Sequence, residues 1–262
     1  MDWLYLHCNW NLCFSSGLNL SKPIFILTSD QDWAPTWAVS SFLETTGDIP
    51  VHIFRTNPCP LLDLAFKSGK ITQGWHPNLL HNSSHGDTQE KVIKYMVKHF
   101  PNCNTARNHT YFTNTHFDRL LFKSGVRADS QIATYHQEDL FPLKDISGIV
   151  RFPVFFEDDV FFDHEAPNLL TEGLLKNLFS PGLKIFNLHA TFIACNTPSA
   201  QHYQKFKSKI FASKTESHEF IYKGKGVKTV FLEIKNIIKD KGYKFQCFQT
   251  FVNNWIEENI KS

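Results

Sequence analysis

The chain has 262 residues, 42% of them hydrophobic and 15% aromatic, and 27 basic against 25 acidic side chains leave a net charge of +2. A domain of this length can bury a large core without disulfide staples. No basic stripe interleaves with stacking aromatic residues, and no apolar run reaches the roughly 20 residues of a membrane span. We therefore expect neither a nucleic-acid partner nor a transmembrane segment.

The first 22 residues match no regular element and carry neither a basic start nor a signal-peptidase site. We expect an N-terminal extension over 1–22, followed by a single domain over 23–262. The six cysteines stand apart from one another, without a Cys-x-x-Cys pair. We interpret them as reduced thiols, which indicates a cytoplasmic protein.

From residue 23 onward the apolar residues predict strands alternating with helices. We place Asp87 at the N-cap of the helix that runs to about residue 100. Such alternation is typical of parallel strands joined by crossover helices, so we expect one α/β domain that closes, or nearly closes, into a (β/α) barrel. In chain order the expected strands are 23–28, 51–54, 71–75, 107–111, 149–156, 183–188 and 243–248, and the expected helices are 35–43, 59–67, 87–100, 229–240 and 250–258.

Polar residues directly follow several of the predicted strands, at the end where the active site of such a fold lies. A hydrolytic metal site needs about three His and Asp ligands and an open position for water. A carboxylate beside the metal can act as general base and a separate imidazole as general acid. The strand ends offer a candidate for each part: Asp30, Asp32, His76, His81, His85, Arg107, His109, the segment 157–159 and His189.

Each of these residues also has a purely structural interpretation. An Asp after a strand is often only a helix N-cap. For Asp30 or Asp32 taken alone, an N-cap and a site residue are equally good interpretations. The acidic segment 157–159 could be a solvated loop. The remaining histidines we assign to the surface or the core: His7, His52, His99, His116, His136, His164, His202 and His218.

Six segments, taken together and in order, resemble the NodB-homology polysaccharide deacetylases, and more closely a branch associated with surface and lipopolysaccharide sugars. The resemblance runs from about Ile24 to Asn196 and implies a distorted (β/α) barrel that removes N-acetyl groups from a sugar or a surface-polysaccharide precursor. The segments are Thr28-Ser29-Asp30-Gln31-Asp32-Trp33-Ala34-Pro35, Gly74-Trp75-His76-Pro77-Asn78, Ser83-Ser84-His85-Gly86, Arg107-Asn108-His109, Phe155-Phe156-Glu157-Asp158-Asp159 and Phe186-Asn187-Leu188-His189.

The resemblance also implies catalytic roles for residues in these segments. Asp30 would be the general base, and His189 the general acid. Arg107 would hold the base carboxylate in place. Asp158 and Asp159 would orient their neighbours by hydrogen bonds.

Asp32, His76 and His85 would hold one divalent metal ion, with zinc expected. Two departures from the common family pattern leave alternatives open. Gln31 separates two Asp residues that are usually adjacent, so base and ligand could be exchanged. The usual i, i+4 spacing would pair His81 with His85, but we prefer His76 with His85 because the segments around these two match the closer branch.

Two other functions remain open at this point. The same machinery could hydrolyse a non-sugar amide, or the chain could be a catalytically silent sugar-binding protein. A binding protein needs no general acid, so the joint presence of base, ligands and acid favours an enzyme acting on an acetylated sugar or glycan.

Overall fold

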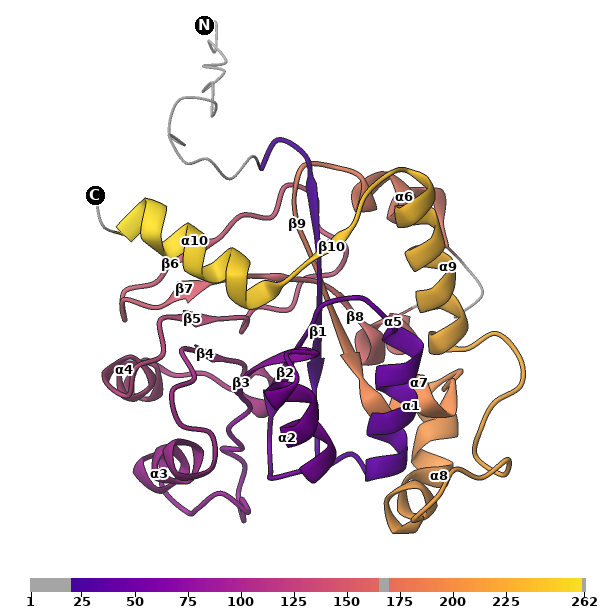
Figure 1. Cartoon of the computed structure of the whole chain (residues 1–262), viewed down its shortest axis with the longest axis horizontal. Coiled ribbons are helices and arrows are strands. Elements are labelled where there is room, and N and C mark those ends of the chain that lie inside the picture. The colour runs from indigo at the N-terminus through magenta and orange to yellow at the C-terminus, as the bar shows by residue number, and fades with distance from the viewer. Residues whose placement is uncertain (1–19, 165–169, 261–262) are drawn as a thin grey trace, which may run out of the picture.

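A computed structural model of the chain describes residues 20–164 and 170–260 (Figure 1). Most of the expected N-terminal extension lies outside these ranges, although Leu20 packs against the hydrophobic core. The boundary between an extension and a single domain stays a prediction. Within the described ranges, no helix is both long enough and apolar enough to span a bilayer.

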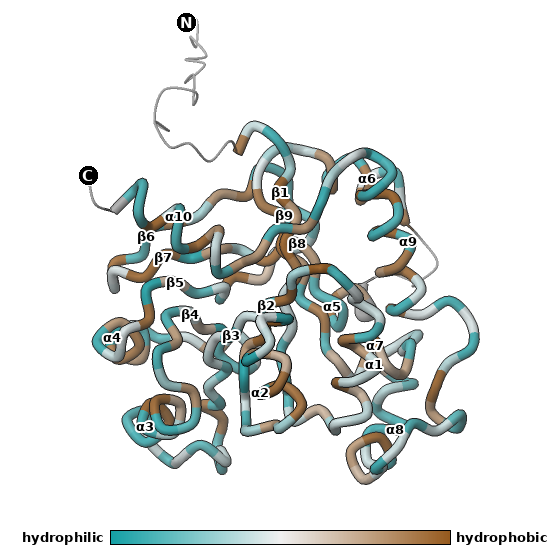
Figure 2. The backbone as a smooth tube through the Cα atoms, viewed as in Figure 1, coloured by the Kyte–Doolittle hydropathy of each residue, from teal (hydrophilic) through white to brown (hydrophobic). Residues whose placement is uncertain are grey.

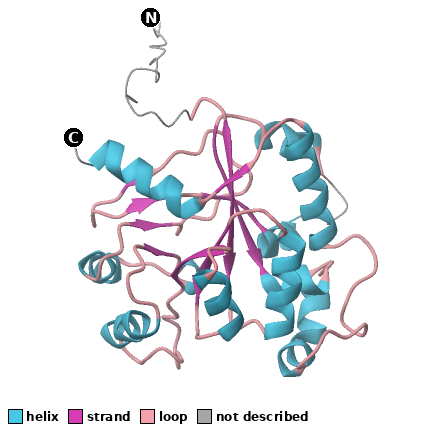
Figure 3. Ribbon diagram, in the orientation of Figure 1, coloured by secondary structure: helices cyan, strands magenta, loops and turns pink. Residues whose placement is uncertain are grey.

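The strands of the described residues join in one curled sheet (Figure 3). Its order is β6-β7-β5-β4-β3-β2-β1-β9-β8, with β10 beside β1, and its pairs are parallel except for β6 with β7. The strands are β1 (Pro23–Asp30), β2 (Val51–Arg55), β3 (Ile71–Trp75), β4 (Thr105–Ala106), β5 (Ala128–Asp129), β6 (Leu143–Lys144), β7 (Val150–Arg151), β8 (Val154–Glu157), β9 (Gly182–His189) and β10 (Phe245–Gln246).

The two ends of this sheet are joined by the chain that follows β5. Ala133 forms a parallel bridge with Val154 of β8. The Val154 N–H donates to the Ile132 carbonyl over 2.8 Å, and the Thr134 N–H donates to the Val154 carbonyl over 3.0 Å. The strands thus curl into a distorted barrel, which confirms the predicted fold class.

Helices cover the outside of the barrel. Figure 1 shows α1, α7 and α9 gathered beside β1 and β9, whereas α10 lies against β1, β2 and β3. The helices are α1 (Thr36–Thr46), α2 (Pro60–Lys67), α3 (Gln89–His99), α4 (Thr115–Lys123), α5 (Asp158–His164), α6 (Glu172–Leu178), α7 (Ala190–Cys195), α8 (Ala200–Ala212), α9 (Val227–Asp240) and α10 (Phe248–Ile260).

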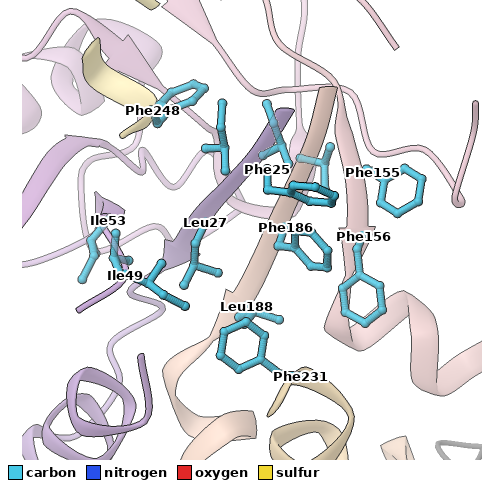
Figure 4. Packing of buried hydrophobic residues seen from close by; sticks show 14 of the residues in the cluster. Phe25, Leu27, Ile49, Ile53, Phe155, Phe156, Phe186, Leu188, Phe231 and Phe248 are labelled. Atoms are coloured by element: carbon cyan, nitrogen blue, oxygen red, sulfur yellow. The ribbon is translucent and has the colours of Figure 1, made fainter. Parts of the chain in front are cut away.

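The core lies on both faces of the long central strands. All eight residues of β1 and of β9 are buried, as expected for parallel strands covered on both sides. Figure 4 shows Phe25 and Leu27 of β1 beside Phe186 of β9, with Phe156 of β8 on the other side of Phe186. The hydrophobic colour in Figure 2 accordingly follows the central strands, and the outer loops are mostly hydrophilic.

One predicted strand, 149–156, is divided in two. Pro153 has no N–H to donate to a neighbouring strand. Before it, β7 pairs with β5, and after it, β8 pairs with β9. The division lets Glu157, at the end of β8, come beside the ends of β1 and β9.

Three other expectations were wrong in detail. No strand covers the expected range 107–111: β4 ends at Ala106, and Thr110 and Tyr111 adopt left-handed φ angles of 58° and 54° and form a 3-10 turn with His109. The N-cap of α3 is Thr88, whose hydroxyl accepts from the Lys91 N–H, and not Asp87. The strand expected over 243–248 shrinks to β10, because α10 already begins at residue 248.

Candidate active site

The side chains at the end of β1 separate onto two faces, because successive residues of a strand point in opposite directions. Asp30 points into the barrel, where its Oδ1 accepts a hydrogen bond from Arg107 over 3.1 Å. Gln31 points away, and its Oε1 accepts from Arg55 Nε over 3.2 Å. Asp32 returns to the same side as Asp30, with a left-handed φ of 43° that turns the chain out of the strand. The spacing of the two Asp residues therefore places both carboxylates in one site.

Three donor atoms converge next to this strand end. Asp32 Oδ1 lies 2.9 Å from His76 Nε2 and 3.0 Å from His109 Nδ1, and the two nitrogens are 3.3 Å apart. A tetrahedral zinc ion with bonds of about 2.1 Å separates its ligands by about 3.4 Å. The triangle is close to that size, so Asp32, His76 and His109 fit one divalent ion after a small expansion.

The triangle is buried on one side and open on the other. The His76 side chain is 1% exposed, because this residue directly follows β3, whereas those of Asp32 and His109 are 23% and 21% exposed. Three protein ligands with one open side are the arrangement of catalytic rather than structural zinc sites.

Asp30 is held by two partners that act as donors. Arg107 is fully buried directly after β4 and donates to Asp30 Oδ1, and the Asn187 amide donates to Asp30 Oδ2 over 2.8 Å. Burial alone would raise the pKa of Asp30, but the charges of His76 and Arg107 outweigh it and keep the pKa below its usual value. Asp30 is thus a fixed, ionised carboxylate at neutral pH.

His189 lies opposite Asp30, because the register of β9 on β1 pairs these two residues. Asp158 accepts from His189 Nδ1 over 2.6 Å and from its backbone N–H over 2.7 Å. The other ring nitrogen, Nε2, faces the site and lies 3.3 Å from Asp32 Oδ2. Burial would lower the pKa of His189, but the Asp158 carboxylate reverses this effect and raises it well above the usual value.

A family model described as WbmS-like polysaccharide deacetylase matches residues 27–207. The chain belongs to this family. The deacetylase is thereby a hydrolase of amide bonds, and its family supports a sugar as the substrate.

Solved structures of similar shape include proteins described as deacetylases. One from Bordetella bronchiseptica, described as a polysaccharide deacetylase involved in O-antigen biosynthesis, has a TM-score of 0.71 and 20% identity over 81% of this chain and 89% of its own. A peptidoglycan N-acetylglucosamine deacetylase has a TM-score of 0.46 and 13% identity over 90% of both chains. A family 4 carbohydrate esterase from Streptomyces lividans has 0.44 and 11% over 85% and 91%. Only the first supports the fold, and no curated protein matches the sequence.

Of the expected metal ligands, His85 lies outside the donor triangle of the deacetylase. The residue is 4% exposed, and its Nδ1 accepts a hydrogen bond from the Asn78 N–H over 2.9 Å. A neutral imidazole that accepts at Nδ1 carries its proton on Nε2, which then has no lone pair for a metal. Burial and the charge of His76 lower the pKa of His85 to about 4, so the ring stays neutral. His81 is exposed, in the loop before α3.

His85 nevertheless has one unpaired polar atom: its Nε2 is buried without a hydrogen-bond partner among the described residues. For that reason His85 is compared with His109 in the metal experiment below.

Asp158 and Asp159 were both expected to orient their neighbours, but their surroundings differ. Asp158 touches His189, as described above. Asp159 is exposed, and its carboxylate accepts from the adjacent Val160 N–H over 2.7 Å at the start of α5. Its influence on the site is that of its charge, which raises the pKa of Asp158 after the larger effect of burial.

Three residues of the site received no specific role from sequence, although two of them were among the strand-end candidates: His109, Asn187 and Glu157. All three stand in the quoted segments. Asn187 lies two positions before His189, so side-chain parity on β9 could have indicated it. Glu157 lies with Asp30 and His189 in a second group of potential ligands. Arg107 already donates to Asp30, and Asn187 donates to both Asp30 and Glu157.

Proposed function

We propose that the chain hydrolyses the N-acetyl group of a sugar in a surface-polysaccharide precursor, with one divalent metal ion held by Asp32, His76 and His109. The observation that carries this proposal is the triangle of donor atoms beside Asp30 and His189. Zinc is the ion we expect, because nitrogen and carboxylate donors in a tetrahedral arrangement suit it.

An ion held by these three residues would polarise the acetyl carbonyl and would lower the pKa of a water molecule to about 7. Asp30 is ionised and takes a proton from the attacking water, while Arg107 and Asn187 hold its carboxylate in one orientation. His189 is charged and gives its Nε2 proton to the departing amine, and Asp158 keeps the ring in place through Nδ1. The products are acetate and a free amino sugar.

Two observations support the biological setting of this proposal. The similar protein from Bordetella bronchiseptica is described as taking part in O-antigen biosynthesis, and we propose a precursor of a surface glycan as the substrate. The four described cysteines are free thiols, which supports a cytoplasmic location, where such precursors with activated sugars are accessible.

Acetate release tests this function directly. The full-length protein, loaded with zinc, should release acetate from at least one member of a panel of N-acetylated nucleotide sugars and surface-glycan fragments. Activity should fall after chelation and return when zinc is added back. Acetate release that is indifferent to chelation would refute metal dependence.

The same panel separates the other two functions. Small cyclic amides and ureides are included, and their hydrolysis in place of the sugars would indicate a non-sugar amidase. A sugar that binds without releasing acetate from the zinc-loaded protein would indicate a binding protein.

A further inference from the structure

Glu157 is a buried carboxyl group that the mechanism above does not use. It ends β8, its residue is 4% exposed, and both of its oxygens have partners. Oε1 accepts a hydrogen bond from the Asn187 amide over 2.9 Å, and Oε2 accepts from the Tyr111 hydroxyl. Glu157 thus connects strand β8 with the residues that surround the proposed general base, Asp30.

Asn187 connects Glu157 with Asp30. Arg107 Nη1 lies 2.6 Å from Asn187 Oδ1. Because a guanidinium only donates, this atom of the amide must be the oxygen, and the NH2 group must face the other way. There it donates to Asp30 Oδ2 over 2.8 Å and to Glu157 Oε1 over 2.9 Å. The two hydrogens of one amide thus link the two carboxyl groups.

Tyr111 holds Glu157 from the opposite side. Its backbone has a left-handed φ of 54°, which is uncommon for an aromatic residue and is found mainly where the surroundings enforce it. This conformation belongs to the loop that also supplies His109. The Tyr111 hydroxyl donates to Glu157 Oε2.

We propose that Glu157 is a positioning residue of this deacetylase, whose carboxyl group, anchored by Tyr111, orients the Asn187 amide and through it the Asp30 carboxylate. The inference rests on the proposed function of Asp30 as general base. Without Glu157, the described acceptor that remains for one amide hydrogen of Asn187 is the Tyr111 hydroxyl, over a long 3.4 Å, so the buried amide loses its better partner and can turn away from Asp30.

The charge of Glu157 is not what matters in this role. Burial raises the pKa of Glu157 well above its usual value, and the charge of Asp159 adds to the effect, so the buried position favours an uncharged side chain. A glutamine keeps both partners, because its oxygen can accept from Asn187, and its NH2 group can donate to the Tyr111 oxygen if the hydroxyl turns its proton away.

The experiment compares Glu157→Ala with Glu157→Gln in the zinc-loaded full-length protein. Glu157→Ala should lower kcat roughly 10- to 100-fold, the usual cost of losing an orienting partner, with KM within about twofold and the metal content unchanged. Glu157→Gln should restore kcat to within about threefold of the parent. In the Asp30→Asn background, Glu157→Ala should cost almost nothing, because the residue through which it acts is already inactive.

Asp118→Ala is the matched control. Asp118 is also a 4% exposed carboxyl with buried partners, accepting from Thr113 and from Arg151, but it has no hydrogen bond to Asp30 or Asn187 among those described. It should lower thermal stability and have the same small effect on kcat in both backgrounds. If Glu157→Ala does not fold, Tyr111→Phe removes one hydroxyl only and should lower kcat several-fold with the same dependence on Asp30.

Crystal structures provide a readout that needs no substrate. The 2.8 Å contact between Asn187 and Asp30 should be lost in Glu157→Ala and kept in Glu157→Gln. The inference is overturned if that contact survives in Glu157→Ala, if kcat does not fall, if Glu157→Gln fails to rescue it, or if the loss is equally large beside Asp30→Asn. A parent protein that releases no acetate would refute the proposed function instead, and the crystal structures would still decide whether Glu157 orients Asp30.

Discussion

Replacing His109 should weaken metal binding far more than replacing His85. Structural zinc sites with four ligands contribute about 10–16 kcal/mol, so one ligand is worth about 3 kcal/mol, or roughly a hundredfold in Kd. His109 Nδ1 lies 3.0 Å from Asp32 Oδ1 and 3.3 Å from His76 Nε2, whereas His85 Nδ1 is occupied by the Asn78 N–H. We therefore expect His109→Ala to raise the Kd for zinc about a hundredfold and His85→Asn to change it less than about threefold.

The choice of asparagine at position 85 keeps an acceptor for the Asn78 N–H, so that a metal effect is not confused with a collapse of the loop. Kd is measured by competition with a chelator, and His76→Ala serves as the positive control because His76 belongs to both ligand sets, the one with His109 and the one with His85. If His85→Asn loses the metal and His109→Ala keeps it, the donor triangle is not the metal site, and the ligand set Asp32, His76 and His85 is restored.

The remaining predictions concern the acid–base residues, one loop histidine and the thiols. Asp30→Asn should keep its metal yet lower kcat by about two to four orders of magnitude, and a metal-free variant would show that Asp30 is a ligand. His189→Ala should harm amide substrates more than activated esters, because an amine leaves poorly without a proton; equal losses on both would argue against a general acid. His81→Ala should keep most of the parent's acetate release, since its side chain is exposed, and loss of activity would bring it back as a ligand. Burial raises the pKa of the Cys103 thiol to about 12, so iodoacetamide at pH 8 should modify it only after unfolding, as peptide mass spectrometry would show.

Long buried strands were predictable from sequence, and short ones were not. The apolar runs of β1 and β9 indicate strands covered on both faces, and their ends place Asp30 and His189 correctly. The two-residue strands β4, β5 and β6 contain too few residues to show any alternation. Their pairing depends on neighbours that the barrel brings together, and sequence patterns do not report such contacts.

Several helices were missed for different reasons. α8 carries lysines along much of its length and buries Ile210 as its one fully buried residue, so its apolar face gives a weak signal. α4 was recognisable in principle, because Asn114 accepts from the Phe117 N–H as an N-cap and the helix buries Phe117 and Leu121. α5 begins inside a segment that we interpreted only as an acidic strand end.

The choice among the histidines was the least predictable part of the site. The strand ends correctly indicate that Asp32 and His76 lie near each other, as the distance of 2.9 Å shows. Whether His85 or His109 completes the set depends on how two loops turn. The left-handed residues after His109 decide its direction, and a Thr-Tyr pair carries no propensity for that conformation.

Successive side chains of β1 point to opposite faces of the sheet. The two faces can therefore evolve, or be engineered, separately. A substitution at Gln31 removes or alters the hydrogen bond between Arg55 and the loop after β1. It does not replace the carboxylates of Asp30 and Asp32. A library confined to the outward positions of this strand would therefore vary stability at nearly constant chemistry. One confined to the inward positions would vary chemistry at the expense of a buried ionic network. Because both faces of β1 are buried, substitutions near its end should alternate, with a period of two, between those that change mainly stability and those that change the site.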